Sequence, residues 1–114
     1  MPMAASYLGE FEQLLLLAIL RLGPGSNGAF APDVARELET RAGRAVSRGH
    51  LYTTLDRLED KGLLRWKLAP GGAVRDGLPR RLYSLTPSGV AALRESRDVL
   101  RRMWRGLDEA LAER

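Results

Sequence analysis

The stretch from Ser47 to Gly62, SRGHLYTTLDRLEDKG, carries signals for both ends of a helix. Ser47 is a preferred N-cap, because its hydroxyl oxygen can accept a hydrogen bond from an otherwise unpaired backbone N–H. Gly62 suits the C-terminal end, because glycine takes positive φ without a Cβ clash. Leu51, Leu55 and Leu58 recur at helical spacing and predict one apolar stripe. The rest of the chain therefore has to supply a core beneath a helix that is buried on one side.

The first turn of this helix carries donor groups, most of them off the leucine stripe. Cationic and hydroxyl groups at the N-terminal end of a half-buried helix suit the major groove of double-stranded DNA. We expect Arg48, His50 and Thr53 to reach base edges and the other members of the set to lie nearer to phosphates. For each arginine, an ordinary solvated side chain is the alternative. The predicted DNA-contacting residues of this helix are Ser47, Arg48, Gly49, His50, Tyr52, Thr53 and Arg57.

Two helices are predicted before it. Residues 10–22, EFEQLLLLAILRL, are apolar on more than one face, and such a helix must be covered on several sides. A second subunit is one source of that cover, and a central position in a monomeric core is the alternative. Residues 32–42 predict a second helix that Pro32 begins and Gly43 ends. Together with the polar helix after Ser47, this second helix forms a helix-turn-helix.

After Gly62 the apolar period changes from helical to two. Leu64, Trp66 and Leu68 alternate with basic residues and predict a strand, and residues 82–85 predict a second one. The segment between them, residues 69–81, is rich in glycine and proline and is expected to be an irregular hairpin tip. A helix-turn-helix followed by a basic hairpin is a winged helix. The arginines expected to bind the DNA backbone or minor groove from this wing are Arg75, Arg80 and Arg81.

Thr86 and Pro87 predict the start of a last helix that runs to about Leu111. Its leucines at 93, 100 and 107 stand seven residues apart, as in a helix that packs on another. We therefore expect residues 1–86 to form the DNA-binding domain and residues 87–114 a C-terminal dimerisation helix. Folding back onto its own domain is the alternative. The predicted dimer interface consists of Leu16, Ile19, Leu100, Met103, Trp104, Leu107 and Leu111. Within it, Trp104 is expected either to pack the dimer or to stack on a flat, hydrophobic effector.

Composition excludes several function classes. The chain contains no cysteine and a single histidine, His50, so neither a metal site nor another cofactor is expected. Ser47 and His50 are close enough on a helix to meet, but Ser47 is better explained as the helix cap, and a catalytic pair also needs a third group to orient it in a pocket, so the protein is not expected to be an enzyme. Lys plus Arg total 18 against 14 Asp plus Glu, a net charge of +4, which permits nucleic-acid binding without demanding it.

Nothing in the sequence indicates export or membrane insertion. The start, MPMAASYLGEFEQ, lacks a basic region leading into an apolar one. The longest apolar run, Leu14 to Leu20, is far shorter than the ~20 residues that span a bilayer. A reducing compartment fits a chain without cysteine, so a cytoplasmic location without membrane contact is expected.

Three segments together resemble the PadR family of bacterial transcriptional regulators: FEQLLLLAILRLG, SRGHLYTTLDRLEDKGLL and RRLYSLTPSGVAAL. The resemblance covers roughly residues 8–93. It implies a homodimeric winged helix whose C-terminal helix makes the dimer. It also implies repression through an inverted-repeat operator, often released by a small hydrophobic or phenolic effector, and places Tyr52 where relatives contact DNA. Relatives commonly carry a Tyr-Gly pair where this chain has Gly28-Ala29-Phe30, and the C-terminal part is a single short helix.

The expected fold class is therefore mainly α with a small β-hairpin: a winged helix-turn-helix plus a C-terminal dimerisation helix. The expected function is that of a sequence-specific DNA-binding transcriptional regulator, acting as a homodimeric repressor. The alternative is a winged-helix protein-interaction module whose basic face is incidental and whose last helix binds a different protein.

Overall fold

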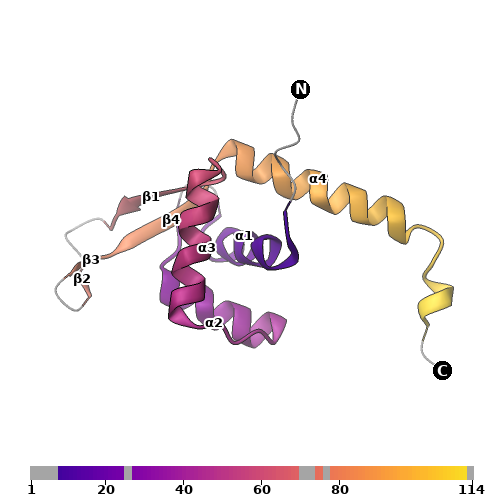
Figure 1. Ribbon diagram of the computed structural model, residues 1–114, viewed down its shortest axis with the longest axis horizontal. Coiled ribbons are helices and arrows are strands. Elements are labelled where there is room, and N and C mark those ends of the chain that lie inside the picture. The colour runs from indigo at the N-terminus through magenta and orange to yellow at the C-terminus, as the bar shows by residue number, and fades with distance from the viewer. Residues whose placement is uncertain (1–7, 25–26, 70–73, 76–77, 113–114) are drawn as a thin grey trace.

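The protein folds as three helices, a hairpin and a long last helix (Figure 1). The computed structural model describes residues 8–24, 27–69, 74–75 and 78–112. Helix α1 (Glu10–Leu22) lies in the middle of the molecule, and α2 (Ala31–Ala42), α3 (Arg48–Asp60) and α4 (Pro87–Trp104) surround it. No helix in the described part of the chain has the length and apolar character needed to span a membrane.

The helix-turn-helix expected from the sequence is present. Gly43 ends α2 with a φ of 68°, in the left-handed region that glycine adopts freely. The Oγ atom of Ser47 caps α3 by accepting the backbone N–H of His50 at 3.1 Å. Gly62 follows α3 with a φ of 79°. The cap and both glycine ends are therefore where the sequence predicts them.

The wing is longer and more regular than expected. Strands β1 (Leu64–Leu68) and β4 (Arg81–Leu85) pair antiparallel with Leu64 opposite Leu85. Two further short strands, β2 (Val74–Arg75) and β3 (Leu78–Pro79), pair with each other. The prediction that residues 69–81 are wholly irregular is therefore wrong, since Val74–Arg75 pairs with Leu78–Pro79 within this stretch.

The segment between α1 and α2 joins the wing to the core. Ala29 and Tyr83 exchange two backbone hydrogen bonds, of 2.8 and 2.9 Å, so that Ala29 lies beside β4 as a third, minimal strand. Gly28, with a φ of 85°, brings the chain there. A Cβ at this glycine would lie 3.1 Å from Cβ of Leu82. The Gly-Ala-Phe sequence that departs from the family pattern thus forms this contact.

The last helix is shorter than predicted. The Oγ1 atom of Thr86 accepts the backbone N–H of Gly89 at 3.0 Å and donates to the carbonyl oxygen of Gly62 at 2.7 Å, which fixes the start of α4 against the end of α3. The helix ends at Trp104, because Arg105 leaves the helical conformation and Gly106 has a φ of 81°. A 3₁₀ turn, η2 (Glu109–Leu111), follows. Leu107 therefore does not continue the seam of Leu93 and Leu100.

The core consists of side chains from every main element. Leu15, Leu16 and Ile19 of α1 are fully buried. They share the core with the leucine stripe of α3 and with Tyr83 of β4. The Tyr83 hydroxyl is buried without a hydrogen-bond partner in the described part of the chain. Burial raises the pKa of Tyr83, and the Arg81 side chain, which lies near the hydroxyl without forming a hydrogen bond of good geometry, opposes this only in part.

Glu12 ties α1 to the end of α3. Its carboxylate accepts hydrogen bonds from Lys61 Nζ at 2.8 Å and from the backbone N–H of Gly9 at 3.1 Å, and the residue is only 9% exposed. Burial on its own would raise the pKa of Glu12. The hydrogen bonds from Lys61 and Gly9, with the charges of Lys61 and Arg57, outweigh burial, so the pKa of Glu12 is lowered from its usual 4.5.

Replacing Glu12 by glutamine should lower the free energy of unfolding at pH 7 by about 1–2 kcal/mol, because Lys61 loses its charged partner. The folded-state pKa of Glu12 lies below the unfolded-state value, so its contribution is complete above the unfolded-state pKa and is lost as pH falls through the folded-state pKa. Urea unfolding across a pH series should show wild type and Glu12→Gln converging below pH 4.5. Glu10→Gln, which breaks the exposed 2.8 Å pair with Arg44, is the control and should change little. A difference independent of pH would contradict the assignment.

Candidate nucleic-acid interface

One face of α3 is exposed, at Arg48, Gly49, Thr53, Asp56 and Arg57. Leu51, Thr54, Leu55 and Leu58 are buried on the other face. Thr54 is accommodated there because its hydroxyl donates to the carbonyl oxygen of His50 at 2.8 Å. In Figure 1 the helix crosses in front of α1, with the wing on one side and α4 on the other. The surface that α3 presents is therefore framed by the hairpin, as in a winged helix.

The N-terminal end of α3 combines a cap, a cation and open backbone. The guanidinium carbon of Arg48 lies 5.3 Å from the centre of the Tyr52 ring, within the range of a cation–π contact. A Cβ built on Gly49 would meet no atom within 4 Å, so the first turn is open to solvent. Together with the positive end of the helix dipole, this arrangement favours an anion such as a DNA phosphate.

The His50 side chain makes a contact that the sequence does not predict. Its ring stacks on Phe11 of α1, with the ring centroids 4.6 Å apart and an interplanar angle of 23°. The side chain therefore lies on the α1 side of α3 rather than along the centre of its exposed face. Thr53 and Arg57 are exposed, as the prediction requires. Asp56 is also exposed on α3, so negative charge begins in the C-terminal half.

The wing arginines pack on aromatic rings. The guanidinium carbon of Arg80 lies 3.7 Å from the centre of the Phe30 ring, and that of Arg81 lies 4.1 Å from the centre of the Trp66 ring. Contacts of this length hold both side chains at the base of the wing. Arg75 belongs to β2, and its side chain lies outside the described residues.

Two further cations on the hairpin were not singled out from the sequence. Arg65 pairs with Ser84 and Lys67 with Leu82 in the β1–β4 register. Alternation along the strands places both on the same face of the hairpin as Arg80, and both are exposed. In the sequence, Arg65 and Lys67 alternate with apolar residues. This alternation predicts a strand but does not by itself indicate that the charged residues contact DNA.

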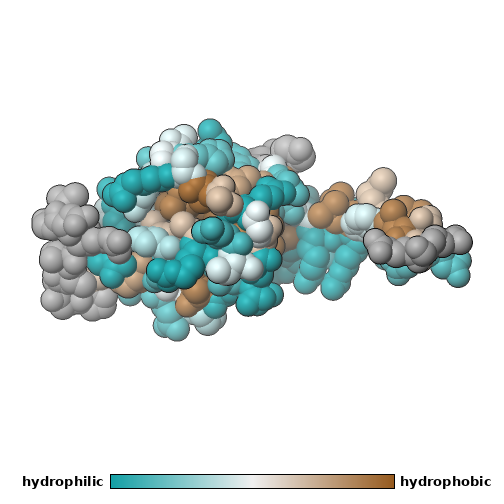
Figure 2. All heavy atoms as spheres, turned by 90° about the horizontal axis from the view of Figure 1, so that it is seen from below, coloured by the Kyte–Doolittle hydropathy of each residue, from teal (hydrophilic) through white to brown (hydrophobic). Residues whose placement is uncertain are grey.

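Some residues of the predicted dimer interface are buried within the chain, and the others are exposed. Leu16 and Ile19 are 0% exposed within one chain, so their assignment to a subunit interface is wrong. Their place on the surface of α1 is taken by Leu17, which is 44% exposed. Leu100, Trp104 and Met103 of α4 are exposed, with 70% exposure at Met103. Apolar atoms gather along the projecting end of the molecule in Figure 2.

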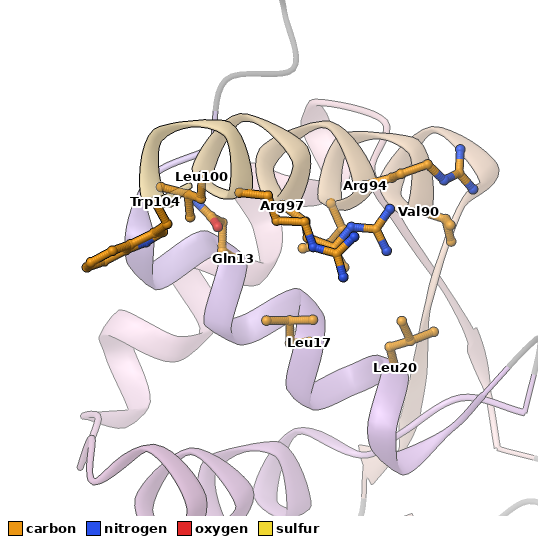
Figure 3. A pocket seen from close by; sticks show the side chains of 10 residues that line it. Gln13, Leu17, Leu20, Val90, Arg94, Arg97, Leu100 and Trp104 are labelled. Atoms are coloured by element: carbon orange, nitrogen blue, oxygen red, sulfur yellow. The ribbon is translucent and has the colours of Figure 1, made fainter. Parts of the chain in front are cut away.

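A groove of about 550 Å³ lies between α1 and α4. Figure 3 shows leucines of α1 facing the side chains of α4 across it. On the α1 side Leu17 and Leu20 are apolar and Gln13 is polar, and α4 adds three arginines and the Trp104 ring. The lining residues are Gln13, Leu17, Leu20, Val90, Leu93, Arg94, Arg97, Leu100, Arg101 and Trp104.

Comparison with known proteins places this architecture in a family. The profile of the transcriptional regulator PadR-like family matches residues 16–95, which contain the helix-turn-helix, the wing and the first turns of α4. The chain belongs to the PadR-like family. The expectation of a winged-helix DNA-binding regulator that is not an enzyme is thereby confirmed at the level of the family.

Individual transcriptional regulators agree with this assignment. The transcriptional regulator Rv3488 of Mycobacterium tuberculosis is 47% identical over 96 residues, covering 84% of this chain and 85% of that protein. A PadR-like transcription factor from Bacteroides fragilis superposes with a TM-score of 0.69 at 25% identity, covering 88% of each chain. A PadR family regulator from Clostridium difficile has the same fold, with a TM-score of 0.68 at 20% identity, covering 90% of this chain and 99% of that one.

Ser47 allows capping and phosphate contact to be separated by experiment. Ser47→Ala should lower the free energy of unfolding by about 1 kcal/mol, because it removes the cap of α3. Ser47→Asp keeps an acceptor at this position and should retain most of that stability, yet it should weaken DNA binding because it adds a negative charge where phosphates are expected. Chemical denaturation and fluorescence anisotropy measure the two effects. Wild-type DNA binding by Ser47→Asp would remove Ser47 from the interface.

Proposed function

We propose that this PadR-like regulator is a homodimeric repressor that binds an inverted-repeat operator in double-stranded DNA. The observation that carries the proposal is the exposed first turn of α3, where Arg48 and the open backbone at Gly49 lie beside the capped helix end. In this arrangement α3 enters the major groove, and Arg48 and Thr53 reach base edges. A dimer bound across a promoter represses by occupying it.

The wing supplies contacts that carry no sequence information. Arg80 and Arg81 are held on their aromatic rings at the base of the hairpin, with the exposed cations Arg65 and Lys67 on β1. Fixed cations beside a recognition helix suit the phosphate backbone. The wing therefore contributes affinity and register, while α3 contributes discrimination.

The homodimer is supported by the exposed apolar face of α4. Trp104 is 50% exposed, and Leu100 and Met103 lie on the same helix beyond the core. An apolar face of this kind on a projecting helix is typical of a surface that another protein covers. In a symmetric dimer the two α3 helices would face successive major grooves, about 34 Å apart.

Release from DNA is proposed to follow the binding of a small, flat, hydrophobic effector beside Trp104. Leu17, Leu20 and Leu100 would form the apolar part of this site, since Leu16 and Ile19 are buried. Such a ligand changes DNA binding only if it favours a dimer geometry in which the two α3 helices no longer match the operator. If the apolar face of α4 instead binds a different protein, the chain is an interaction module, and the experiments below separate the two.

The first experiment measures binding to the DNA upstream of the protein's own gene and to random DNA. Arg48→Ala should cost about 1–3 kcal/mol on the operator and relax the preference at one base position, because one base-edge contact is lost. Arg102→Ala on α4 removes the same charge from an exposed site and is the control. Equal losses on operator and random DNA would contradict base reading by Arg48.

The combined wing variant, Arg80→Ala with Arg81→Ala, provides the contrast in the same assay. It should weaken binding to all sequences alike. The slope of the logarithm of the binding constant against the logarithm of the salt concentration should become less steep, by the amount that corresponds to about two phosphate contacts. An unchanged salt slope would show that these arginines only pack on Phe30 and Trp66.

The second experiment tests assembly. Leu100→Arg should convert a dimer into a folded monomer, because the side chain is 47% exposed in the single chain and a charge there disrupts only the interface. Leu22→Arg, at a 39% exposed leucine outside the groove, is the matched control and should remain dimeric. Sedimentation equilibrium measures both. A wild-type protein that is monomeric at micromolar concentration would overturn the homodimer and favour the interaction module.

A further inference from the structure

The first turn of α1 contacts both ends of the recognition helix α3. The Phe11 ring stacks on His50 in the first turn of α3, with 4.6 Å between the ring centroids and 23° between the ring planes. The neighbouring residue Glu12 accepts a hydrogen bond from Lys61 Nζ, at the end of α3, at 2.8 Å. His50 and Lys61 are about three helical turns apart, or about 16 Å, but only about 20° apart around the helix axis. Two adjacent residues of α1 therefore hold one edge of α3 at both of its ends.

Two contacts along one edge restrict the rotation of α3. A helix held at a single point can still turn and tilt about that point, whereas two well-separated points oppose both motions. The leucine stripe keeps the other side of α3 in the core, but apolar contacts are non-directional and fix the rotation less sharply than a ring stack and an ion pair do. The Phe11 side chain is itself anchored, because it is half-buried and packs against the core.

The rotation of α3 decides which groups face a groove of DNA. Gly49 and Thr53 lie near the middle of the exposed face, between about 60° and 100° from His50 around the helix. Arg48 lies on the opposite edge, about 160° from His50, with its guanidinium carbon 5.3 Å from the centre of the Tyr52 ring. At the surface of a helix, a rotation of about 10° moves an atom by about 1 Å.

Such a movement affects the two kinds of DNA contact differently. A hydrogen bond to a base edge requires a donor–acceptor distance close to 3 Å and good alignment, so a shift of about 1 Å breaks it. The attraction between cations and phosphates is less directional and survives the same shift. Loss of the contact between α1 and α3 should therefore lower the preference for one DNA sequence over another before it lowers binding to DNA in general.

We propose that Phe11 is a positioning residue for sequence recognition. By stacking on His50 it fixes the rotation of α3, so that Arg48 and Thr53 meet base edges. His50 acts through this stack and does not read a base itself. The inference rests on the DNA binding proposed above, and it adds a residue outside the helix-turn-helix on which the discrimination between sequences depends.

The two phenylalanines of the sequence allow a matched test. Phe11→Leu removes the ring beside His50, and Phe30→Leu removes the ring under Arg80 of the wing. Fluorescence anisotropy measures the binding of both variants to the DNA upstream of the protein's own gene and to random DNA. Phe11→Leu should lose about tenfold of its preference for the upstream DNA, an effect within the range of one base-edge contact, and should bind random DNA like wild type. Phe30→Leu should bind both DNAs more weakly and keep the preference.

This comparison separates the role of Phe11 from DNA binding itself. Chemical denaturation first establishes that each variant is folded under the conditions of the assay. An equal preference in wild type and Phe11→Leu would overturn the positioning role and leave the proposed function intact. A wild-type protein without any preference for the upstream DNA would overturn both.

Substitutions of His50 distinguish stacking from base reading. His50→Phe keeps a flat ring against Phe11 but removes both ring nitrogens, so it should keep the preference of wild type. His50→Ala should lose about as much preference as Phe11→Leu, and combining these two substitutions should cost no more, because both break the same contact. Loss of preference in His50→Phe, or a full second loss in the combined variant, would overturn the proposal.

Proton NMR tests the stack without DNA. Because His50 is the only histidine of the sequence, its imidazole protons give signals that belong to one residue. Stacking on the Phe11 ring should shift these signals upfield, and the shift should disappear in Phe11→Leu and remain in Phe30→Leu. Imidazole signals that Phe11→Leu leaves unchanged would overturn the stack and the positioning role with it.

Discussion

Burial of α1 is the constraint on which the rest of the structure depends. Leu15, Leu16 and Ile19 are completely enclosed, because α2, β4 and the start of α4 pack against this helix and the leucines of α3 belong to the same core. Burial of such side chains is the main favourable term in folding. Because the core is small, no main element can be removed without exposing it, and the positions of α3, the wing and α4 relative to one another follow from their shared contact with one helix.

Features encoded by neighbouring residues could be predicted from the sequence. The Ser47 cap, the glycine ends of α2 and α3, and the Thr86 cap of α4 all lie where the sequence placed them. Each depends on one residue type that satisfies a local backbone need, either a hydrogen-bond acceptor or a positive φ. The positions of the helix-turn-helix and of the hairpin follow from these local signals and from the change of apolar period.

Features that depend on distant residues could not be predicted in the same way. The Phe30 ring under Arg80 and the pairing of Glu12 with Lys61 join positions far apart in the sequence. The burial of Leu16 rather than Leu17 depends on how α1 is rotated against its neighbours, which a run of leucines leaves open. The end of α4 is a different case. Gly106 is a residue that commonly ends a helix, but the seven-residue spacing of Leu93, Leu100 and Leu107 predicts a helix that continues past it.

The first turn of α1 holds the recognition helix at both ends. Phe11 stacks on His50 near the start of α3, and Glu12 accepts a hydrogen bond from Lys61 at the end of α3. Glu10 forms an exposed ion pair with Arg44, in the turn before α3. The same rigid rod continues into the groove through Leu17 and Leu20. In the proposed dimer α1 would therefore join the subunit contact to α3. A small rotation of α1 caused by whatever fills the groove would then reach the surface of α3 that is proposed to face DNA, with no hinge between them.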